Sequence, residues 1–442
     1  MPGNVPEGAA GQPARGLGRL FIRKSVEQMH AEHSSSELKR SLSSANLISL
    51  GIGCIIGTGI FVLTGRAAAE FAGPAIMVSF IITGVLCTFV ALCYSELASM
   101  LPVSGSAYSY SYASMGEVVA WIMGLLLVLE YGLAASTVAV GWSGYVVSLL
   151  HDLGLHLPAE LTAAPGVEIK EDGVVVAHGM VNLPAIIAIT GVTWLLVRGV
   201  QESANVNNVI VMIKLSVVIA FIAVGFFFVN TANWFPLVPN EIPAPPAGTE
   251  RGFWEDIWRA MKDVVSAQNT SRYGVGGVIA GAATIFFAYI GFEAVSTAGA
   301  EAKNPARDMP IGIIGSLAIC TVLYILTSAV LVGIVPYAQL DTPAPIAMAV
   351  NHMGMPWFAI LVKIGAIAGM SSVMLVLLYG QTRIFYAMSR DGLLPSMFSR
   401  VHPRFRTPWI DTIIVGTVAA GFAGLMSLNA LADLTNVGSL AA

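Results

Sequence analysis

Two glycine-containing segments inside apolar stretches hold the groups best suited to bind a small polar molecule. The segment from Gly51 to Phe61 has four glycines in its first nine residues. Each interior glycine costs a helix roughly 1 kcal/mol relative to alanine. Close helix packing accounts for Gly53 and Gly57, four residues apart, but two glycines that flank Thr58 indicate an unwound turn. The segment therefore predicts a helix that breaks near Thr58.

A break of this kind is a binding site for a zwitterion. Unwound main chain is tolerated within a membrane only where it faces a cavity or other protein. Amides at the start of the following half-helix suit a carboxylate, because the positive end of the helix dipole lies there. Carbonyls that end the preceding half suit an ammonium group. An α-amino acid carries both groups, so the expected chemistry is binding.

A second segment, Ala283 to Ala294, repeats this pattern. Gly291 lies in the middle of an apolar stretch and Glu293 follows two residues later. Ionisable residues inside a membrane are costly and usually functional, although Glu293 could instead pair with another buried polar group for structure alone. The breaks fall in the first and sixth stretches. Interrupted helices at corresponding positions of two halves are typical of transporter sites at an inverted-repeat interface.

Glu130, Lys214 and Lys363 are further charged residues that lie well inside apolar stretches. Lys214 follows Asn208 by six residues, so its side chain could snorkel to the interface. The alternative is a coupling role, because burial disfavours the charged form of a lysine. A lysine that exchanges a proton could couple transport to a proton gradient, and one that stays charged could replace Na⁺. Either role predicts Na⁺ independence. Lys363, near the outer end of its stretch, is expected to be an interfacial anchor.

The elements that carry these residues are predicted membrane-spanning helices. The chain of 442 residues is 56% hydrophobic and only 11% charged, against about 25% charged residues in a soluble domain. Nine apolar stretches approach or exceed the ~20 residues that span a bilayer. They cover residues 46–66, 74–95, 118–150, 183–199, 208–229, 275–300, 311–335, 356–388 and 409–428, and Asn429 to Ala442 begins a tenth. The expected class is an all-α polytopic membrane protein.

Charge and motif patterns bound the location and the function. Lys and Arg are concentrated in the N-terminal tail, residues 1–43, and in the loops on its side, which predicts a cytoplasmic N-terminus in the plasma membrane. The tail lacks the apolar core of a signal peptide. The net charge of −4 and the absence of a basic stripe argue against nucleic acid. No hydrolase or Walker motif is present and the four cysteines form no CxxC pair, so we expect no enzyme activity, no metal and no cofactor.

Several motifs together resemble the amino acid–polyamine–organocation superfamily. They are residues 51–61, 94–98 with Pro102, 105–108, and 292–293 with 301–305. Within it, the chain is similar to bacterial members of the cationic amino acid transporter branch, on residues 130–132, Lys214, 380–383 and 388–395. The match begins near residue 38. Family members continue through tenth, eleventh and twelfth helices, so the chain is expected to stop inside the tenth.

The resemblance implies a five-plus-five inverted-repeat (LeuT-like) transporter fold over residues 44–442, with repeats at about 44–230 and, incomplete, about 275–442. It implies that a substrate carboxylate rests on the amides of Thr58 and Gly59, beside Gly57. It implies carbonyl partners for the amino group, from Ile55, Phe287, Ala288 and Ile290. A proton-linked role falls on Lys214. An aromatic residue is expected to close over the substrate, best matched by Phe287 and less well by Tyr289 and Phe292. Glu130, Gly291 and Glu293 are candidates for gating or polar support.

The predicted function is secondary active transport of an amino acid, proton-coupled and Na⁺-independent, by alternating access in a lipid bilayer. The alternative within transport is a cationic amino acid or polyamine exchanger, for which Glu130 or Glu293 would supply an acidic partner. A transport-dead amino acid sensor is a remote alternative. The sequence leaves open the substrate side chain and whether a small single-helix accessory subunit binds.

Overall fold

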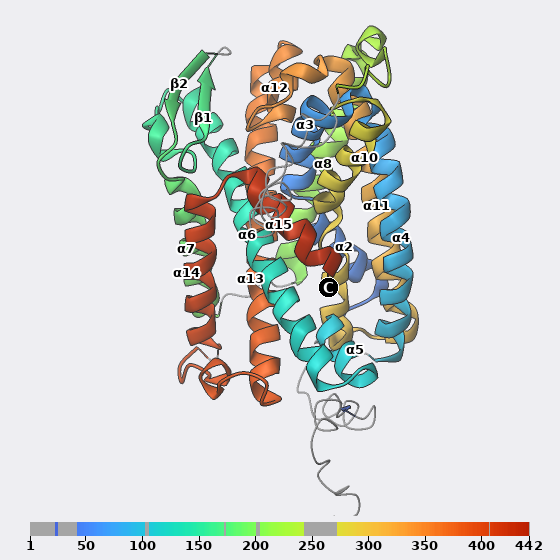
Figure 1. The fold of residues 1–442 in the computed structure, drawn as a ribbon, viewed down its shortest axis with the longest axis vertical. Coiled ribbons are helices and arrows are strands. Elements are labelled where there is room, and N and C mark those ends of the chain that lie inside the picture. Colours follow the sequence, from blue (N-terminus) through green and yellow to red (C-terminus); the bar gives the residue numbers. More distant parts are fainter. Residues whose placement is uncertain are drawn as a thin grey trace, which may run out of the picture.

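The computed structural model describes residues 23–24, 42–101, 106–171, 174–199, 204–242, 272–405 and 407–441. Almost all of the predicted tail, residues 1–43, lies outside this part of the chain. The described helices form an elongated bundle (Figure 1). They are α2 (Ser44–Ile55), α3 (Thr64–Ala67), α4 (Ile76–Met100), α5 (Ser106–Ser114), α6 (Glu117–Asp152), α7 (Leu183–Val197), α8 (Ala204–Gly225), α10 (Gly274–Ile285), α11 (Pro305–Ile334), α12 (Pro345–His352), α13 (Pro356–Arg390), α14 (Trp409–Leu425) and α15 (Leu428–Ala441).

The helices coincide with the predicted apolar stretches, which confirms a polytopic helical membrane protein. Among the described residues, six helices are long and apolar enough to cross a membrane, while α2, α7 and α14 are shorter apolar helices. The first stretch runs further than predicted, through a π-helical turn (Gly59–Leu63), α3 and a second π-helical turn that ends at Ala72. The chain is thus helical almost to the start of α4.

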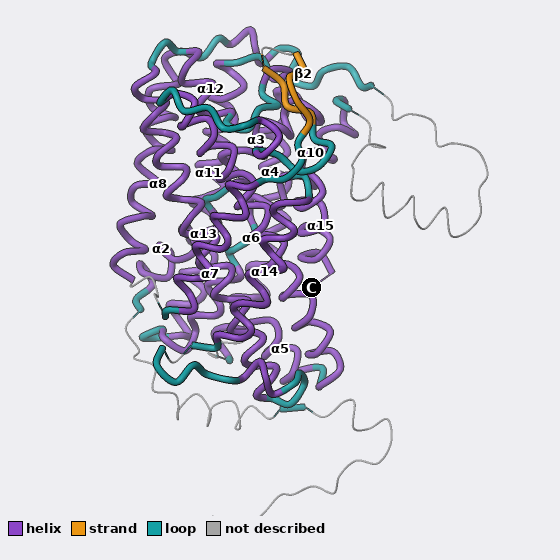
Figure 2. Tube along the Cα trace, turned by 90° about the vertical axis from the view of Figure 1, so that its left-hand side faces the viewer, coloured by secondary structure: helices purple, strands orange, loops and turns teal. Residues whose placement is uncertain are grey.

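The helical fold carries one small β element that the sequence analysis does not predict. The loop between α6 and α7 carries an antiparallel hairpin of β1 (Glu168–Glu171) and β2 (Val174–His178). Figure 2 shows this hairpin at one end of the bundle and α5 at the other. The two strands are short and largely exposed, so they add a cap to the helical fold without changing its core.

Two long helices form the centre of the bundle. The 36 residues of α6 and the 35 of α13 pack against each other over the height of the molecule (Figure 1). On one side α14 packs against α7, and on the other α11 packs against α4 and α2. Helices that lie five spans apart in the chain have matching lengths. The long helices α6 and α13 are one such pair, and the broken helices α2 and α10, with 12 residues each, are another.

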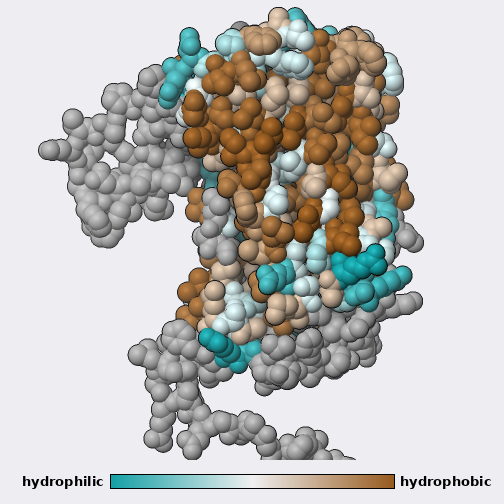
Figure 3. Space-filling model, turned by 90° about the vertical axis from the view of Figure 1, so that its right-hand side faces the viewer, coloured by the Kyte–Doolittle hydropathy of each residue, from teal (hydrophilic) through white to brown (hydrophobic). Residues whose placement is uncertain are grey.

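An apolar outer surface matches a lipid environment. In the view of Figure 3, hydrophobic side chains cover the middle and upper part of the molecule and hydrophilic ones gather near its lower end. On α4, large side chains such as Val85, Leu86 and Phe89 are more than half exposed. Water would penalise such a continuous exposed face, whereas hydrocarbon does not. Lipid therefore accounts for this surface.

The expectation that Lys363 is an interfacial anchor is wrong. Its side chain is only 2% exposed, its ammonium contacts the carboxylate of Asp152, and it donates to the Ser148 carbonyl at 3.1 Å. Lys363 belongs to α13 and its two partners to the last turns of α6. The residue thus ties the C-terminal end of α6 to the N-terminal part of α13.

Candidate functional site

The first break separates α2 from the π-helical turn at Gly59–Leu63. Ile56 is extended, with φ −75° and ψ 98°, and the main chain returns to helical angles at Thr58. The last carbonyls of α2 and the first amides after the break therefore lie on either side of a short non-helical step. Helix ends leave such groups without intrahelical partners. This is the arrangement that the glycine spacing predicted.

The second break lies between α10 and a 3-10 helix at Glu293–Glu301. A short 3-10 turn (Phe286–Tyr289) ends α10, and Ile290 is extended, with φ −54° and ψ 133°. Gly291 has φ 115°, a conformation that side chains of L-residues rarely adopt. A Cβ at this position would also lie 3.0 Å from the main chain of Cys54. Glycine is thus required at Gly291 by its backbone angle and by the close approach of α2.

The two breaks lie against each other. A Cβ at Gly59 would overlap Ala288, including its Cα atom. The absence of a side chain at Gly59 lets the main chains of the two broken helices meet. Together with the contact between Gly291 and Cys54, this packing brings amides and carbonyls of both breaks into one small region.

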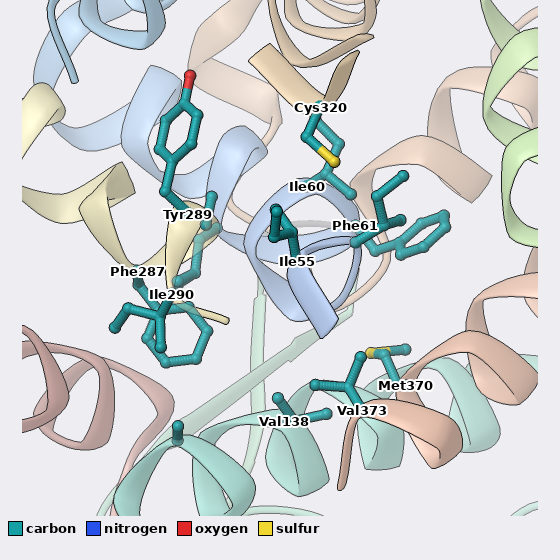
Figure 4. Close-up of a cluster of buried hydrophobic side chains, with 14 of the residues drawn as sticks. Ile55, Ile60, Phe61, Val138, Phe287, Tyr289, Ile290, Cys320, Met370 and Val373 are labelled. Carbon is teal, nitrogen blue, oxygen red and sulfur yellow. The ribbon is translucent and has the colours of Figure 1, made fainter. Parts of the chain in front are cut away.

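Apolar side chains surround this region. In Figure 4, Phe287 and Ile290 lie on one side of the segment that carries Ile55 and Ile60, and Val138, Met370 and Val373 lie on another. The hydroxyl of Thr58 is fully buried, 3.4 Å from the Val138 carbonyl and 3.3 Å from the Met370 sulfur. No labelled residue of the group is more than 8% exposed. The described site is closed to solvent in this conformation.

Lys214 reaches the first broken helix from α8. Its side chain is fully buried and its ammonium donates to the carbonyl of Gly53 at 2.6 Å. Gly369 of α13 leaves room for the lysine stem, since a Cβ there would lie 3.0–3.2 Å from Cγ, Cδ and Cε. This geometry does not match a snorkelling side chain. It places a cationic group on the last turns of α2, two residues before Ile55.

The buried carboxylates of Glu130 and Glu293 have different surroundings. One oxygen of Glu293 accepts from the amide of Gly291 at 2.9 Å, and its other oxygen is buried with no hydrogen-bond partner among the described residues. Glu130 is 3% exposed and accepts from Ser439 of α15. Glu293 therefore supports the second break directly, whereas Glu130 connects α6 to α15.

The candidate aromatic residues do not all face the breaks. Tyr289 points away from Ile55 in Figure 4, and its hydroxyl donates to the Phe80 carbonyl of α4 at 2.9 Å. The ring of Phe292 packs edge-on against Tyr94, 6.0 Å between centroids. Of the three residues, Phe287 alone is drawn beside Ile290 at the site. Phe287 therefore packs with the apolar side chains about the breaks, as the prediction for it requires.

Sequence reasoning missed two polar side chains at the breaks. Tyr324 of α11 places its hydroxyl 2.8 Å from the Ile55 carbonyl and 3.0 Å from that of Ala288. Asn436 of α15 donates to the carbonyl of Ala283, near the end of α10, at 3.0 Å. A buried tyrosine usually finds a hydrogen-bond partner, but its position in an apolar stretch does not reveal which carbonyl it meets.

Comparisons with known proteins agree with this architecture. A family model described as amino acid permease matches residues 42–442. The chain belongs to the amino acid permease family. It is 46% identical to the methylthioribose transporter of Bacillus subtilis (strain 168) over 96% of this chain and 84% of that protein. It is 45% identical to the branched-chain amino acid permease BcaP of the same organism, over 96% and 83%. It is also similar to cationic amino acid transporter 4, vacuolar, of Arabidopsis thaliana, at 36% identity over 96% of this chain and 65% of that protein.

A solved structure shows the same fold for this amino acid permease. The crystal structure of MhsT in complex with L-phenylalanine superposes with a TM-score of 0.58, covering 88% of this chain and 80% of that one. The sequence identity is 15%, so the likeness concerns the fold. It confirms the predicted all-α transporter fold with broken helices at its centre.

Proposed function

We propose that this permease transports a neutral α-amino acid together with protons, by alternating access, across a plasma membrane with its N-terminus in the cytoplasm. The observation that carries the proposal is the pairing of the two breaks. Amides at Thr58 and Gly59 would receive the α-carboxylate beside Gly57. The carbonyls of Ile55, Ala288 and their neighbours Phe287 and Ile290 would receive the α-ammonium group.

The apolar surroundings favour a neutral side chain. A buried charge without a partner is strongly unfavourable, and the buried side chains of Phe287, Ile290 and Val138 offer a charged substrate side chain no partner. A cationic substrate would need Glu130 or Glu293 as its acidic partner. Glu130 already accepts from Ser439, whereas Glu293 accepts from the Gly291 amide through one oxygen and has its second oxygen without a partner among the described residues. Branched-chain permeases among the relatives favour an aliphatic substrate such as leucine.

A second candidate substrate is an uncharged thioether sugar. The 46% identity to a methylthioribose transporter supports it. Sugar hydroxyls could use the same main-chain donors and acceptors, and a thioether would suit the apolar walls. Such a ligand leaves the charge complementarity of the two breaks unused, so we rank it below an amino acid.

Lys214 is the proposed proton-coupling group. A bond between its ammonium and Gly53 ties α8 to the broken helix. Loss of the proton would remove the charge from this hydrogen bond and weaken the tie between α8 and α2, because a neutral amine is a weaker donor than an ammonium group. Proton movement would thereby bias the angle of the broken helix, which is the coupling that alternating access needs.

The moving and fixed parts follow from the helix packing. We propose two repeats, at about 44–230 and about 275–442, in which the broken helices rock against the pair formed by α6 and α13. Main chain that is unwound at Ile56 and Gly291 can absorb a change of angle between half-helices. A small single-helix accessory subunit is not required by this scheme.

Uptake into proteoliposomes tests the proposal. Labelled leucine, arginine and methylthioribose would be compared under an inward proton gradient, with and without Na⁺, for the wild type and Lys214→Ala. We expect leucine uptake that depends on the proton gradient, is insensitive to Na⁺ and collapses in the variant. Preferred arginine or methylthioribose uptake would contradict the substrate class, and proton dependence that survives in Lys214→Ala would contradict the coupling role.

A further inference from the structure

The hydroxyl of Tyr324 occupies the point at which carbonyls from both broken helices converge. Its oxygen lies 2.8 Å from the Ile55 carbonyl, at the end of α2, and 3.0 Å from the Ala288 carbonyl, just after α10. The tyrosine itself belongs to α11, which is not broken. A single side chain therefore contacts the main chain of both breaks.

The ring that carries this hydroxyl is held on two sides. It packs against Phe80, with centroids 5.4 Å apart, and against Tyr289, with centroids 5.5 Å apart. The hydroxyl of Tyr289 in turn donates to the main chain of Phe80. Tyr324 is fully buried. Its oxygen is thus fixed relative to the two carbonyls and cannot turn to water.

Hydrogen-bond counting shows that this arrangement has too few donors. A phenol has one proton, so it can donate to Ile55 or to Ala288 at one time, although each carbonyl oxygen can accept two hydrogen bonds. Buried acceptors without a donor are unfavourable. Tyr324 consequently holds both carbonyls in place, but at any one time its proton leaves one of them without this donor. An ammonium group, with three N–H donors, can donate to both carbonyls.

We infer that Tyr324 is a positioning residue that orients the Ile55 and Ala288 carbonyls to bind the α-ammonium group of the substrate. The inference rests on the proposed function, because it concerns the amine end of the same site. It adds a residue from α11 to a site otherwise built from main-chain groups. The role predicts discrimination: loss of the Tyr324 hydroxyl should weaken the binding of ligands with an ammonium group more than that of otherwise identical ligands with a hydroxyl in its place.

The test compares two ligands in two variants. Full-length protein in proteoliposomes would take up labelled leucine in competition with unlabelled leucine or with 2-hydroxy-4-methylpentanoate, which carries a hydroxyl in place of the amino group. Tyr324→Phe retains the packed ring and removes the proton. We expect it to weaken leucine binding by about tenfold, which corresponds to one hydrogen bond that involves a charged group. Binding of the hydroxy acid should weaken less, because its hydroxyl is uncharged and donates a single hydrogen bond.

Tyr145→Phe is the matched control. Tyr145 is also fully buried and its hydroxyl donates to a main-chain carbonyl, that of Phe61, at 2.8 Å, but this carbonyl lies beyond the first break. The control should alter both ligands alike or neither. If Tyr324→Phe weakens both ligands equally, or leaves leucine binding unchanged, the positioning role is overturned.

Two further experiments apply if the hydroxy acid or the Tyr324→Phe variant cannot be used. If the hydroxy acid binds too weakly for its inhibition constant to be measured, N-methyl-leucine, whose ammonium group has one N–H fewer, replaces it. The loss of affinity from leucine to N-methyl-leucine should be larger in the wild type than in Tyr324→Phe. Equal losses of affinity in the two proteins would overturn the role. If Tyr324→Phe does not fold, a fluorinated tyrosine at position 324 preserves the shape and changes donor strength. It should alter the affinity for leucine more than that for the hydroxy acid, and no change would overturn the role. A wild type that does not bind leucine at all contradicts the proposed function instead.

Discussion

Single residues at the breaks explain why this site could be recognised from the sequence. Two glycines that flank Thr58 are poor helix residues, and the structure uses one of them for a close contact that no side chain would permit. Gly291 adopts a positive φ that few other residues tolerate. The positions of the glycines therefore reflect the main-chain geometry, and they predicted both breaks to within a few residues.

Substitution of Gly59 tests this reading. In Gly59→Ala the new methyl group would overlap Ala288, so the two breaks must separate. We expect a stability loss of about 1–3 kcal/mol, as in other overpacked cores, and at least a tenfold rise in the KM for leucine uptake. Thermal unfolding in detergent and initial uptake rates measure the two effects.

Gly191→Ala provides the control for that substitution. Gly191 lies within α7, and a Cβ there would meet nothing within 4 Å. The variant should transport leucine normally and melt at the same temperature or slightly above it, because alanine favours a helix. Equal transport in Gly59→Ala and Gly191→Ala would show that close contact between the breaks is unnecessary.

Other residues could not be predicted, because their roles depend on partners far away in the chain. Tyr324 and Asn436 bind carbonyls of the breaks from α11 and α15, and an apolar stretch gives no sign of such contacts. Lys363 was assigned to the interface from its distance to the end of a stretch. Its real position follows from Asp152, 211 residues earlier.

Among the secondary-structure elements, the length of an apolar stretch predicted the length of the helix most reliably. The two longest apolar stretches, 118–150 and 356–388, became α6 and α13, which extend a few residues beyond them because polar residues complete the helix ends. The hairpin was missed. Its signal was an Asp172-Gly173 pair between Lys170-Glu171 and a run of valines, a combination that favours a tight β-turn.

The ion pair between α6 and α13 gives a prediction at this scale. Lys363 is 2% exposed and Asp152 27% exposed. Asp152→Ala leaves a buried ammonium without its counter-ion and should cost about 3 kcal/mol. Lys363→Met should cost less, because methionine fills the apolar space and the remaining carboxylate can reach water. Thermal unfolding of both variants shows which substitution lowers the stability more.

The double variant Asp152→Ala, Lys363→Met separates charge from packing in that experiment. It should be more stable than Asp152→Ala alone, because no uncompensated charge remains. A double variant that is less stable than either single variant would mean that the pair contributes through packing rather than through charge. Leucine uptake should persist in all three, since the pair lies near the ends of the two helices.

For the whole molecule, the sequence predicted the class, the broken helices and the family, and the matches to residues 42–442 and to a solved transporter fold confirm them. The arrangement around the breaks required the structure. Periodicity and glycine spacing are local, whereas the site is assembled from α2, α6, α8, α10, α11 and α13, which lie far apart in the chain. Topology, rather than any local signal, brings them together.

The central claim is that the paired breaks bind the carboxylate and ammonium groups of an amino acid. The most direct measurement is the melting temperature of the purified wild type against increasing leucine, with leucinamide, which lacks the carboxylate, titrated in parallel. We expect leucine to raise the melting temperature and leucinamide to require at least a hundredfold higher concentration for the same rise, because the amides at Thr58 and Gly59 lose a charged partner. Equal stabilisation by leucine and leucinamide would contradict the claim.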